Sequence, residues 1–219
     1  MGLKDVYTNL IQVYTRKGDS GETGLFGGSK ISKDSIKVEA YGSIDEAAAF
    51  IGEARANLTD KNLKDILYKI QEKFLVIGAH LASDKNGINK LKEEIEDSDI
   101  EELENIIDSY SKNLLPLYKF IIPGDNKESA SLHIARTVVR RSERRIVALK
   151  GRETVEPNLL KYVNRVSDVL FVLSRVVEDS AAVKFISETI LKSIDSTEKK
   201  LNLESAKKIV LAGEKKAKE

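Results

Sequence analysis

The chain has 219 residues, of which 41% are hydrophobic and 32% charged, a composition typical of a folded globular protein rather than a disordered one. Its 36 basic and 35 acidic residues leave a net charge of +1, which argues against a general binder of nucleic acid or of anionic membranes. Cysteine is absent, which excludes disulfides and thiolate chemistry. There is no signal-peptide pattern and no run of 18 apolar residues, so we expect a cytoplasmic protein.

The first unusual segment is glycine-rich and covers residues 15–33, TRKGDSGETGLFGGSKISK. Five of the 13 glycines fall between Gly18 and Gly28, beside hydroxyl groups and the cations of arginine and lysine. Glycine lets backbone N–H groups converge on a bound oxygen, and lysine supplies a mobile positive charge. Such a loop suits a polyphosphate, although the composition is also typical of a mobile linker. Neither a Walker A loop nor a GxGxxG turn is present.

Three helices are predicted in the next part of the chain. A Ser-x-x-Glu capping box at residues 43–46 predicts a helix that begins there and runs to about Leu58. The second helix has apolar residues at alternating spacings of four and three: Leu63, Leu67, Ile70, Phe74, Ile77 and Leu81. A turn is expected over residues 84–87, and a second capping box at residues 98–101 predicts a helix to about Tyr110. Residues 120–124, FIIPG, indicate a short extended piece and a turn.

An arginine-rich helix is predicted over residues 132–147, LHIARTVVRRSERRIV. One stripe at helical spacing is expected to be buried: Ala135, Val139, Ser142, Ile146 and Leu149. Arg136, Arg140 and Glu143 each follow a stripe residue by one position and so lie on its flank. Two arginines one turn apart beside apolar surface repel each other unless an anion neutralises them. That anion is either a protein carboxylate, in a solvated face with its own ion pairs, or a ligand phosphate.

A further long helix follows Pro157, with a continuous apolar face: Leu159, Val163, Val166, Leu170, Leu173 and Val177. Asn164 follows this face by one position, so neighbouring helices would bring its amide close to the arginines; a local hydrogen bond is the alternative role. Asp168 is expected to form a structural ion pair, with Arg165 as one candidate partner.

Long helices joined by short connections predict an all-α antiparallel bundle. We expect residues 1–182 to form the bundle domain, with the glycine-rich loop at about residues 14–33. Residues 183–219 are expected to form a charged C-terminal extension, either a docked helix or a partly disordered segment.

Five ordered blocks of this sequence resemble the PduO-type ATP:cob(I)alamin adenosyltransferase family. They are TRKGDSGETGLFGG, residues 32–46, FIIPGD, LHIARTVVRRSERR and YVNRVSD, and they span about residues 14–175. The resemblance implies a ferritin-like five-helix bundle that assembles as a homotrimer and binds ATP between subunits. It also implies a transferase of vitamin B12 metabolism, which moves the 5′-deoxyadenosyl group of ATP to the cobalt of cob(I)alamin or a related corrinoid and releases triphosphate.

The resemblance also implies roles for individual residues. The positions that would bind ATP are Thr15, Arg16, Lys17, Gly18, Thr23, Gly24, Lys33, Arg140, Arg144 and Asn164. Arg140, Glu143 and Phe120 would be catalytic, with Phe120 against the lower face of the corrinoid and Glu143 beside an ATP-bound Mg²⁺. Arg136 would pair with Asp45 across the subunit interface. The chain departs from the family's usual pattern at Lys17, Lys37 and Asp125, and the last of these bears on affinity for the corrinoid.

The implied chemistry needs no protein nucleophile, because cob(I)alamin is itself the nucleophile. A flavoprotein reductase and a cobalamin-dependent acceptor enzyme are the expected partners, with no nucleic acid and no membrane. The sequence leaves two interpretations from other classes of protein. A di-iron bundle is disfavoured because Ile77 and Ala130, rather than glutamates, stand three positions before His80 and His133. A non-catalytic helical module that binds nucleotide or RNA through the Arg136 and Arg140 face is the alternative function.

Overall fold

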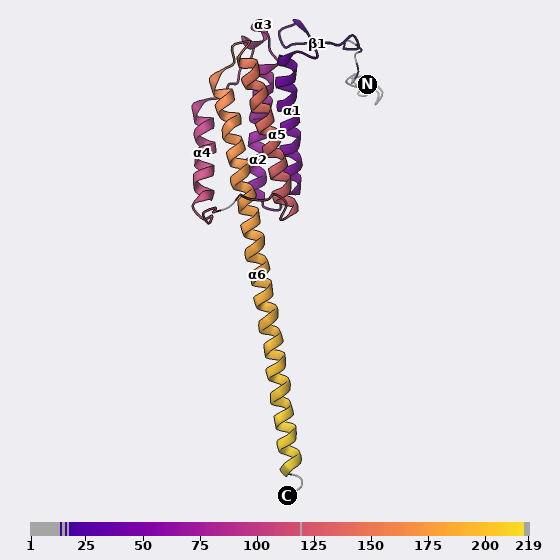
Figure 1. The fold of residues 1–219 in the computed structure, drawn as a ribbon, viewed down its shortest axis with the longest axis vertical. Coiled ribbons are helices and arrows are strands. Elements are labelled where there is room, and N and C mark those ends of the chain that lie inside the picture. Colours follow the sequence, from indigo (N-terminus) through magenta and orange to yellow (C-terminus); the bar gives the residue numbers. More distant parts are fainter. Residues whose placement is uncertain (1–13, 15, 17, 119, 217–219) are drawn as a thin grey trace, which may run out of the picture. The chain divides into compact units, whose positions relative to one another are not determined.

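The computed structural model describes residues 14, 16, 18–118 and 120–216 (Figure 1). Two of the expected ATP contacts, Thr15 and Lys17, therefore lie outside the described residues. The elements in chain order are β1 (Glu22–Gly24), β2 (Lys30–Ser32), α1 (Ile36–Asn57), α2 (Lys61–Leu81), α3 (Lys85–Ile88), α4 (Asp97–Ser111), α5 (Lys127–Lys150) and α6 (Pro157–Lys216). The prediction of an all-α bundle is confirmed, with one short hairpin added before the first helix.

The chain divides into two compact units, residues 1–174 and 175–219. The first contains the hairpin, helices α1 to α5 and the first part of α6, which together form the bundle. The second contains the rest of α6, which is helical to Lys216. The boundary expected between residues 182 and 183 stays a prediction. No helix among the described residues is long and apolar enough to cross a membrane.

The apolar stripes read from the sequence form the core of the bundle. All five stripe residues of α5 are buried, as are the six of α2 and the first five of α6. Val177, which belongs to the second unit, is also buried. The Ser142 hydroxyl lies within this core and donates a hydrogen bond of 2.6 Å to the Ser43 carbonyl of α1. Burial of these side chains is the dominant favourable contribution to the stability of the bundle.

Ion pairs on the outside of the bundle show how neighbouring helices run. Arg141 of α5 pairs with Glu46 of α1 at 2.6 Å, and Arg145 pairs with Glu39 at 3.0 Å. The residue numbers rise along α5 while they fall along α1, so the two helices are antiparallel. Helix α4 lies at the edge of the bundle (Figure 1), where α2 and α6 both form ion pairs with it: Lys69 with Glu102, Lys73 with Asp99, and Arg165 with Glu104.

Two helix starts differ from the sequence prediction. α1 begins at Ile36 rather than at residue 43, because Ser35 is its N-cap and accepts a hydrogen bond from the Val38 amide. Ser43 lies inside the helix, and its hydroxyl donates to the Ala40 carbonyl. α4 begins at Asp97, because Glu96 and Asp99 form its capping box in place of the pair at residues 98 and 101.

Two of the predicted connections take a specific form. Residues 84–87 were predicted as a turn, and Asp84 instead caps the four-residue helix α3. Residues 120–124 form no regular element: the chain bends at residues 123 and 125–126 before α5, and Gly124 has a positive φ of +122°.

Candidate functional site

The glycine-rich segment folds into a hairpin (the glycine-rich hairpin, residues 18–33). β1 and β2 are antiparallel, with Thr23 opposite Ile31 and Gly24 opposite Lys30. At the base of the hairpin the Lys33 ammonium donates a hydrogen bond of 2.8 Å to the Gly18 carbonyl. A Cβ at Gly18 would lie 2.9 Å from the Lys33 nitrogen, so the absence of a side chain permits this approach. The hairpin thus brings together Gly18, Thr23, Gly24 and Lys33, four of the expected ATP contacts.

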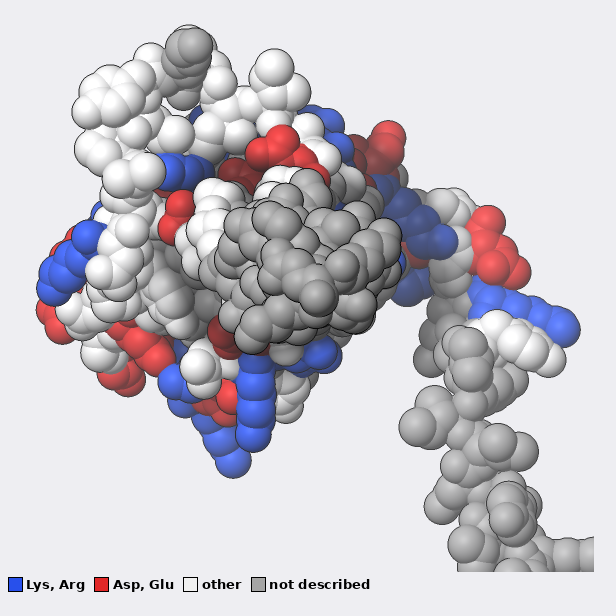
Figure 2. Space-filling view, turned by 90° about the horizontal axis from the view of Figure 1, so that it is seen from below, with Lys and Arg blue, Asp and Glu red and all other residues white. Residues whose placement is uncertain are grey.

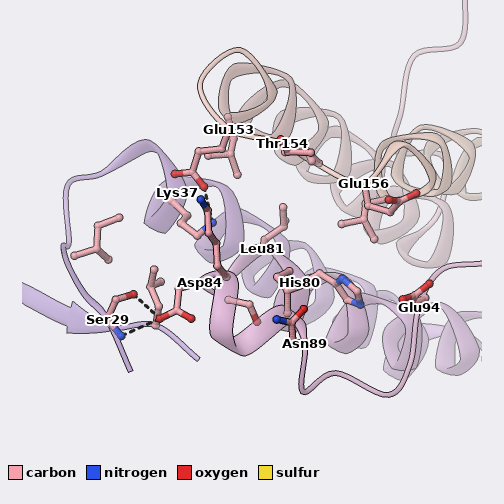
Figure 3. Close-up of a pocket in the computed structure, with 18 of the residues that line it drawn as sticks. Ser29, Lys37, His80, Leu81, Asp84, Asn89, Glu94, Glu153, Thr154 and Glu156 are labelled. Atoms are coloured by element: carbon pink, nitrogen blue, oxygen red, sulfur yellow. Dashed lines mark hydrogen bonds and ion pairs between the residues drawn. The ribbon is translucent and has the colours of Figure 1, made fainter. Parts of the chain in front are cut away.

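The tip of the glycine-rich hairpin is packed against the junction of α2 and α3. The Phe26 amide donates to the Ala82 carbonyl at 2.9 Å, and the Asp84 amide donates to the Phe26 carbonyl at 3.0 Å. The Asp84 carboxylate also accepts hydrogen bonds from the Ser29 amide at 2.9 Å and the Ser29 hydroxyl at 2.6 Å, as Figure 3 shows. These bonds, led by the one from the Ser29 hydroxyl, lower the pKa of Asp84 to about 2.

The arginines of α5 fall into two groups. Arg141 and Arg145 face α1 and are neutralised by Glu46 and Glu39. Arg136, Arg140 and Arg144 have no carboxylate within 4 Å among the described residues, and Arg144 donates only to the Arg140 carbonyl, at 2.9 Å. Arg140 and Arg144 are exposed, so they do form a solvated face. The ion pairs that this interpretation expects are present on Arg141 and Arg145, and among the described residues they are absent from the other three arginines.

Arg136 is the most unusual of these cations. Its guanidinium lies over the Phe171 ring of α6, 5.8 Å from the centroid, and its Nε is buried without a hydrogen-bond partner. Burial lowers the pKa of Arg136, and the neighbouring Arg140 lowers it further. Both effects penalise the charged form, and a nearby anion would relieve both.

Glu143 and Asn164 form the polar link between α5 and α6 on this face. The Asn164 amide donates a hydrogen bond of 2.8 Å to a carboxylate oxygen of Glu143. Asn164 therefore bonds not to a local group but to another expected site residue, 21 positions away on the neighbouring helix. The ion pair expected for Asp168 is confirmed, since its carboxylate lies 3.4 Å from Arg165.

Phe120 lies in the connection between α4 and α5 and is fully exposed, with a relative exposure of 103%. Exposed apolar neighbours accompany it: Leu115, Leu117, Tyr118 and Ile122. An exposed apolar cluster of this kind marks a surface that binds another molecule. This connection and the glycine-rich hairpin lie at opposite ends of the bundle (Figure 1).

The expected site residues therefore occupy three places on one chain: the hairpin, the α5–α6 face and the α4–α5 connection. Among the described residues, no hydrogen bond or ion pair joins the hairpin positions to Arg140, Glu143 or Asn164. Asp45 of α1 is exposed and forms no ion pair with Arg136 within the chain. A cavity of about 830 Å³ lies beside the hairpin and is lined by Ser29, Lys37, His80, Asp84 and Glu153, among others (Figure 3). None of the expected site residues lines it.

The histidines and carboxylates do not form a metal site of the usual kind. Among the residues described, no group of three or more His, Asp or Glu side chains could hold a metal ion. His80 is buried, and its Nε2 lies 2.7 Å from the Glu93 carbonyl, which agrees with a structural role. His133 is buried with its ring edge toward Phe171.

The face that Figure 2 shows bears on the alternative of an RNA-binding module. On the face seen in Figure 2, basic and acidic side chains alternate with uncharged ones, and neither sign dominates. The structure thus defines a helical bundle with a glycine-rich hairpin and a face of three arginines that lack carboxylate partners. That combination is characteristic of a protein that binds a polyanionic ligand.

Comparison with known proteins identifies the family. Residues 13–177 match the family described as cobalamin adenosyltransferase, and this chain belongs to that family. It is 43% identical over 174 residues to a corrinoid adenosyltransferase of Citrobacter freundii, covering 80% of this chain and 99% of the relative. It is 42% identical over 178 residues to that of Bacillus subtilis, covering 79% and 90%.

Solved structures agree with this assignment. A phenylalanine-to-alanine variant of the PduO-type ATP:corrinoid adenosyltransferase from Lactobacillus reuteri, complexed with cobalamin and ATP, superposes with a TM-score of 0.71. It is 31% identical in sequence, and the match covers 76% of this chain and 93% of that one. An arginine-to-lysine variant of the enzyme, complexed with ATP, has the same TM-score at 32% identity and covers 76% and 94%.

Proposed function

We propose that this protein transfers the 5′-deoxyadenosyl group of ATP to the cobalt of cob(I)alamin or a related corrinoid. In this reaction the Co(I) electron pair attacks the 5′ carbon of ATP, a cobalt–carbon bond forms, and the carbon–oxygen bond to the triphosphate breaks. The triphosphate leaves with the electron pair of that bond. Because the cobalt is the nucleophile, the protein's task is to position the two substrates and to stabilise the leaving charge.

The observation that carries the proposal is the division of the α5 arginines into neutralised and unneutralised groups. Arg136, Arg140 and Arg144 keep their charge without a carboxylate partner among the described residues, whereas Arg141 and Arg145 on the same helix are paired. Guanidinium groups form bidentate, charge-assisted hydrogen bonds to phosphate. Arg140 and Arg144 would hold the triphosphate and stabilise its growing charge.

The glycine-rich hairpin would supply the other half of the nucleotide site. The Lys33 ammonium donates to the Gly18 carbonyl, and a phosphate oxygen would be a stronger acceptor for the same cation. Arg16, Thr23 and Gly24 lie on or beside this hairpin, and Thr15 and Lys17 would complete the loop. Asn164 would orient the Glu143 carboxylate toward the ligand.

Mg²⁺ is expected to accompany ATP. Mg²⁺ keeps several waters and is held chiefly by substrate phosphates, so it does not require a cluster of protein ligands. Glu143 suits a single protein contact to the metal or its waters, because one of its oxygens accepts from Asn164 and the other remains for this role.

The corrinoid would bind at the exposed apolar connection between α4 and α5. The Phe120 ring would lie against the lower face of the corrinoid and exclude an axial ligand from the cobalt. Such a ligand stabilises the more oxidised metal, so its exclusion eases reduction to Co(I). Asp125 lies five residues further on in the same connection and is exposed, so a charged group stands near this surface.

The complete site would form in a homotrimer. The separation of the three groups of site residues on one chain supports this, because residues of two subunits would then surround one ATP. Arg136 would pair with Asp45 of a neighbouring subunit, which would neutralise a guanidinium whose Nε is buried without a partner. In the cytoplasm, a flavoprotein reductase would supply the electron and a cobalamin-dependent enzyme would accept the product.

An anaerobic assay tests the proposal directly. Chemically reduced cob(I)alamin is mixed with protein, ATP and Mg²⁺, and the Co(I) absorption is followed together with triphosphate release. We expect one triphosphate for each Co(I) lost, and no loss with a nonreactive ATP analogue in which carbon replaces the 5′ oxygen. A stable Co(I) spectrum in the presence of folded protein and ATP would overturn the proposal.

A further inference from the structure

Asp84 lies outside every group of residues that the proposed function uses, yet it joins two of the elements around the site. One of its carboxylate oxygens accepts from the Asn86 and Gly87 amides, both at 2.9 Å, and so caps α3. The other accepts from the Ser29 amide and hydroxyl of the glycine-rich hairpin. Each oxygen thus serves one element, and the single side chain fastens the hairpin tip to the bundle.

The backbone around Asp84 is shaped for this contact. Gly27 has φ of +120°, and a Cβ at that position would lie 1.7 Å from an Asp84 carboxylate oxygen. A Cβ at Gly87 would lie 1.8 Å from the Phe26 carbonyl oxygen. The hairpin tip and the α2–α3 junction therefore approach more closely than any side chain would permit. Two backbone hydrogen bonds between Phe26 and residues 82 and 84 complete the contact.

We propose that Asp84 is the positioning residue of the glycine-rich hairpin: it holds the hairpin tip on the bundle so that Lys33 and Gly18 are in place before the triphosphate binds. The inference rests on the proposed role of the hairpin in ATP binding. Four N–H and O–H donors stabilise the ionised carboxylate, and its bonds to Ser29 join residues 55 positions apart in sequence. A hairpin held in advance loses less conformational entropy when the ligand binds.

Two variants separate anchoring from helix capping. Ser29→Ala removes the hydroxyl donor and leaves the α3 cap intact, whereas Asp84→Ala removes both. If anchoring matters, both should raise the KM for ATP, by about tenfold for Asp84→Ala and about threefold for Ser29→Ala, with kcat within about twofold of the original. Asp60→Ala is the matched control, because Asp60 caps α2 through the Asn62 and Leu63 amides and does not touch the hairpin. It should leave the KM for ATP unchanged.

A glycine pair tests the close approach. Gly27 and Gly28 both have positive φ, +120° and +110°, so alanine brings similar backbone strain at either position. Only Gly27→Ala also places a methyl group against Asp84, since nothing lies within 4 Å of a Cβ at Gly28. Gly27→Ala should therefore raise the KM for ATP well beyond the effect of Gly28→Ala. Equal effects would show that the contact with Asp84 contributes nothing.

Hydrogen exchange of the ATP-free protein tests, independently of activity, whether Asp84 anchors the glycine-rich hairpin. The Phe26 and Ser29 amides should exchange at least about tenfold faster in Asp84→Ala, while amides in the middle of α5 keep their rates. Unchanged exchange at the hairpin would overturn the inference even if turnover is normal. If the original protein shows no adenosylation, the proposed function fails, and the exchange data still decide the inference. If turnover is normal and both variants keep the original KM, the inference fails and the function stands.

Discussion

The Asn164 amide of α6 donates a hydrogen bond of 2.8 Å to the Glu143 carboxylate of α5, across the helix pair that carries the unneutralised arginines. Both residues are partly buried, so the bond is shielded from water and fixes the direction of the carboxylate. A carboxylate oriented in this way beside Arg140 and Arg144 suits a role at the ATP site.

Asn164→Asp should therefore disrupt the site without unfolding the bundle. The new carboxylate would face Glu143, and like charges at this distance repel each other and raise the pKa of the pair. We expect adenosylation to fall by tenfold or more, with the free energy of unfolding changed by about 1 kcal/mol. Asn158→Asp is the control, because Asn158 lies on the same helix and donates at 3.2 Å only to the Ile95 carbonyl. Similar activity losses in both variants would count against a specific role of Asn164.

Arg140 and Arg141 are adjacent on α5 and should respond differently to truncation. Arg140→Ala should weaken ATP binding or transition-state stabilisation by about 2 to 4 kcal/mol, because it removes a charge-assisted contact to phosphate. Arg141→Ala removes a half-exposed pair with Glu46 and should cost at most about 1 kcal/mol of stability, with normal kinetics. Calorimetric ATP titration and steady-state kinetics measure both effects. Normal ATP affinity in Arg140→Ala would show that the nucleotide binds to another face of the protein.

Truncation of Phe120, on the proposed corrinoid surface, can be compared with truncation of Phe74, in the core of the bundle. Phe74 is buried, and Phe74→Ala should lower the free energy of unfolding by about 3 to 5 kcal/mol. Phe120 is fully exposed, so Phe120→Ala should leave thermal stability unchanged. It should impair adenosylation most with cob(II)alamin and a weak reductant, and much less with cob(I)alamin supplied, because the axial ligand has then already gone. Equal impairment in the two assays would refute ligand exclusion.

Exchanging the charges of Asp45 and Arg136 tests the subunit contact. Each single reversal, Asp45→Arg or Arg136→Asp, should place like charges across the interface and weaken the trimer by about 2 to 5 kcal/mol. The double variant should recover part of this loss, since opposite charges face each other again. Light scattering and sedimentation measure the oligomer. A trimer that is equally stable in all three variants would exclude this ion pair.

The low pKa of Asp84 predicts a specific acid sensitivity. Folding lowers this pKa from 3.8 to about 2, so the folded state favours the ionised carboxylate. The resulting stabilisation is fully present above about pH 4 and is lost as the pH falls from about 4 to 2. Asp84→Asn carries no charge to lose, so its free energy of unfolding should depend less on pH in that window. In Ser29→Ala the pKa of Asp84 should be lowered less, because the Ser29 hydroxyl is the leading cause of the shift. The free energy of unfolding of this variant should therefore also depend less on pH below about 4. Denaturant titrations between pH 2 and 6 measure the free energy of unfolding of the original protein and of the two variants. Parallel pH profiles for all three would show that Asp84 is not the source of the acid sensitivity.

The helices and their buried faces follow from the local pattern of the sequence. Apolar residues at alternating spacings of three and four predicted the core stripes of α2, α5 and α6, because a helical repeat of 3.6 residues places such positions on one side. The same periodicity places Arg136, Arg140 and Asn164 on the flanks of these buried faces. The capping box at residue 43 predicts a later start for α1 than the structure has, because Ser35 and Ser43 are both competent caps locally and Ser35 is the one that caps the helix.

Which charges are neutralised, and what holds the glycine-rich hairpin, depend on contacts between segments that are far apart in the sequence. Arg140 and Arg141 carry the same side chain, and the packing of α1 against α5 gives a carboxylate partner to Arg141 and not to Arg140. Asp84 and Ser29 lie 55 positions apart, and nothing local to either indicates the bond between them. Helical periodicity is a local property of the chain, whereas ion pairs and anchoring contacts depend on which distant segments the fold brings within hydrogen-bond distance.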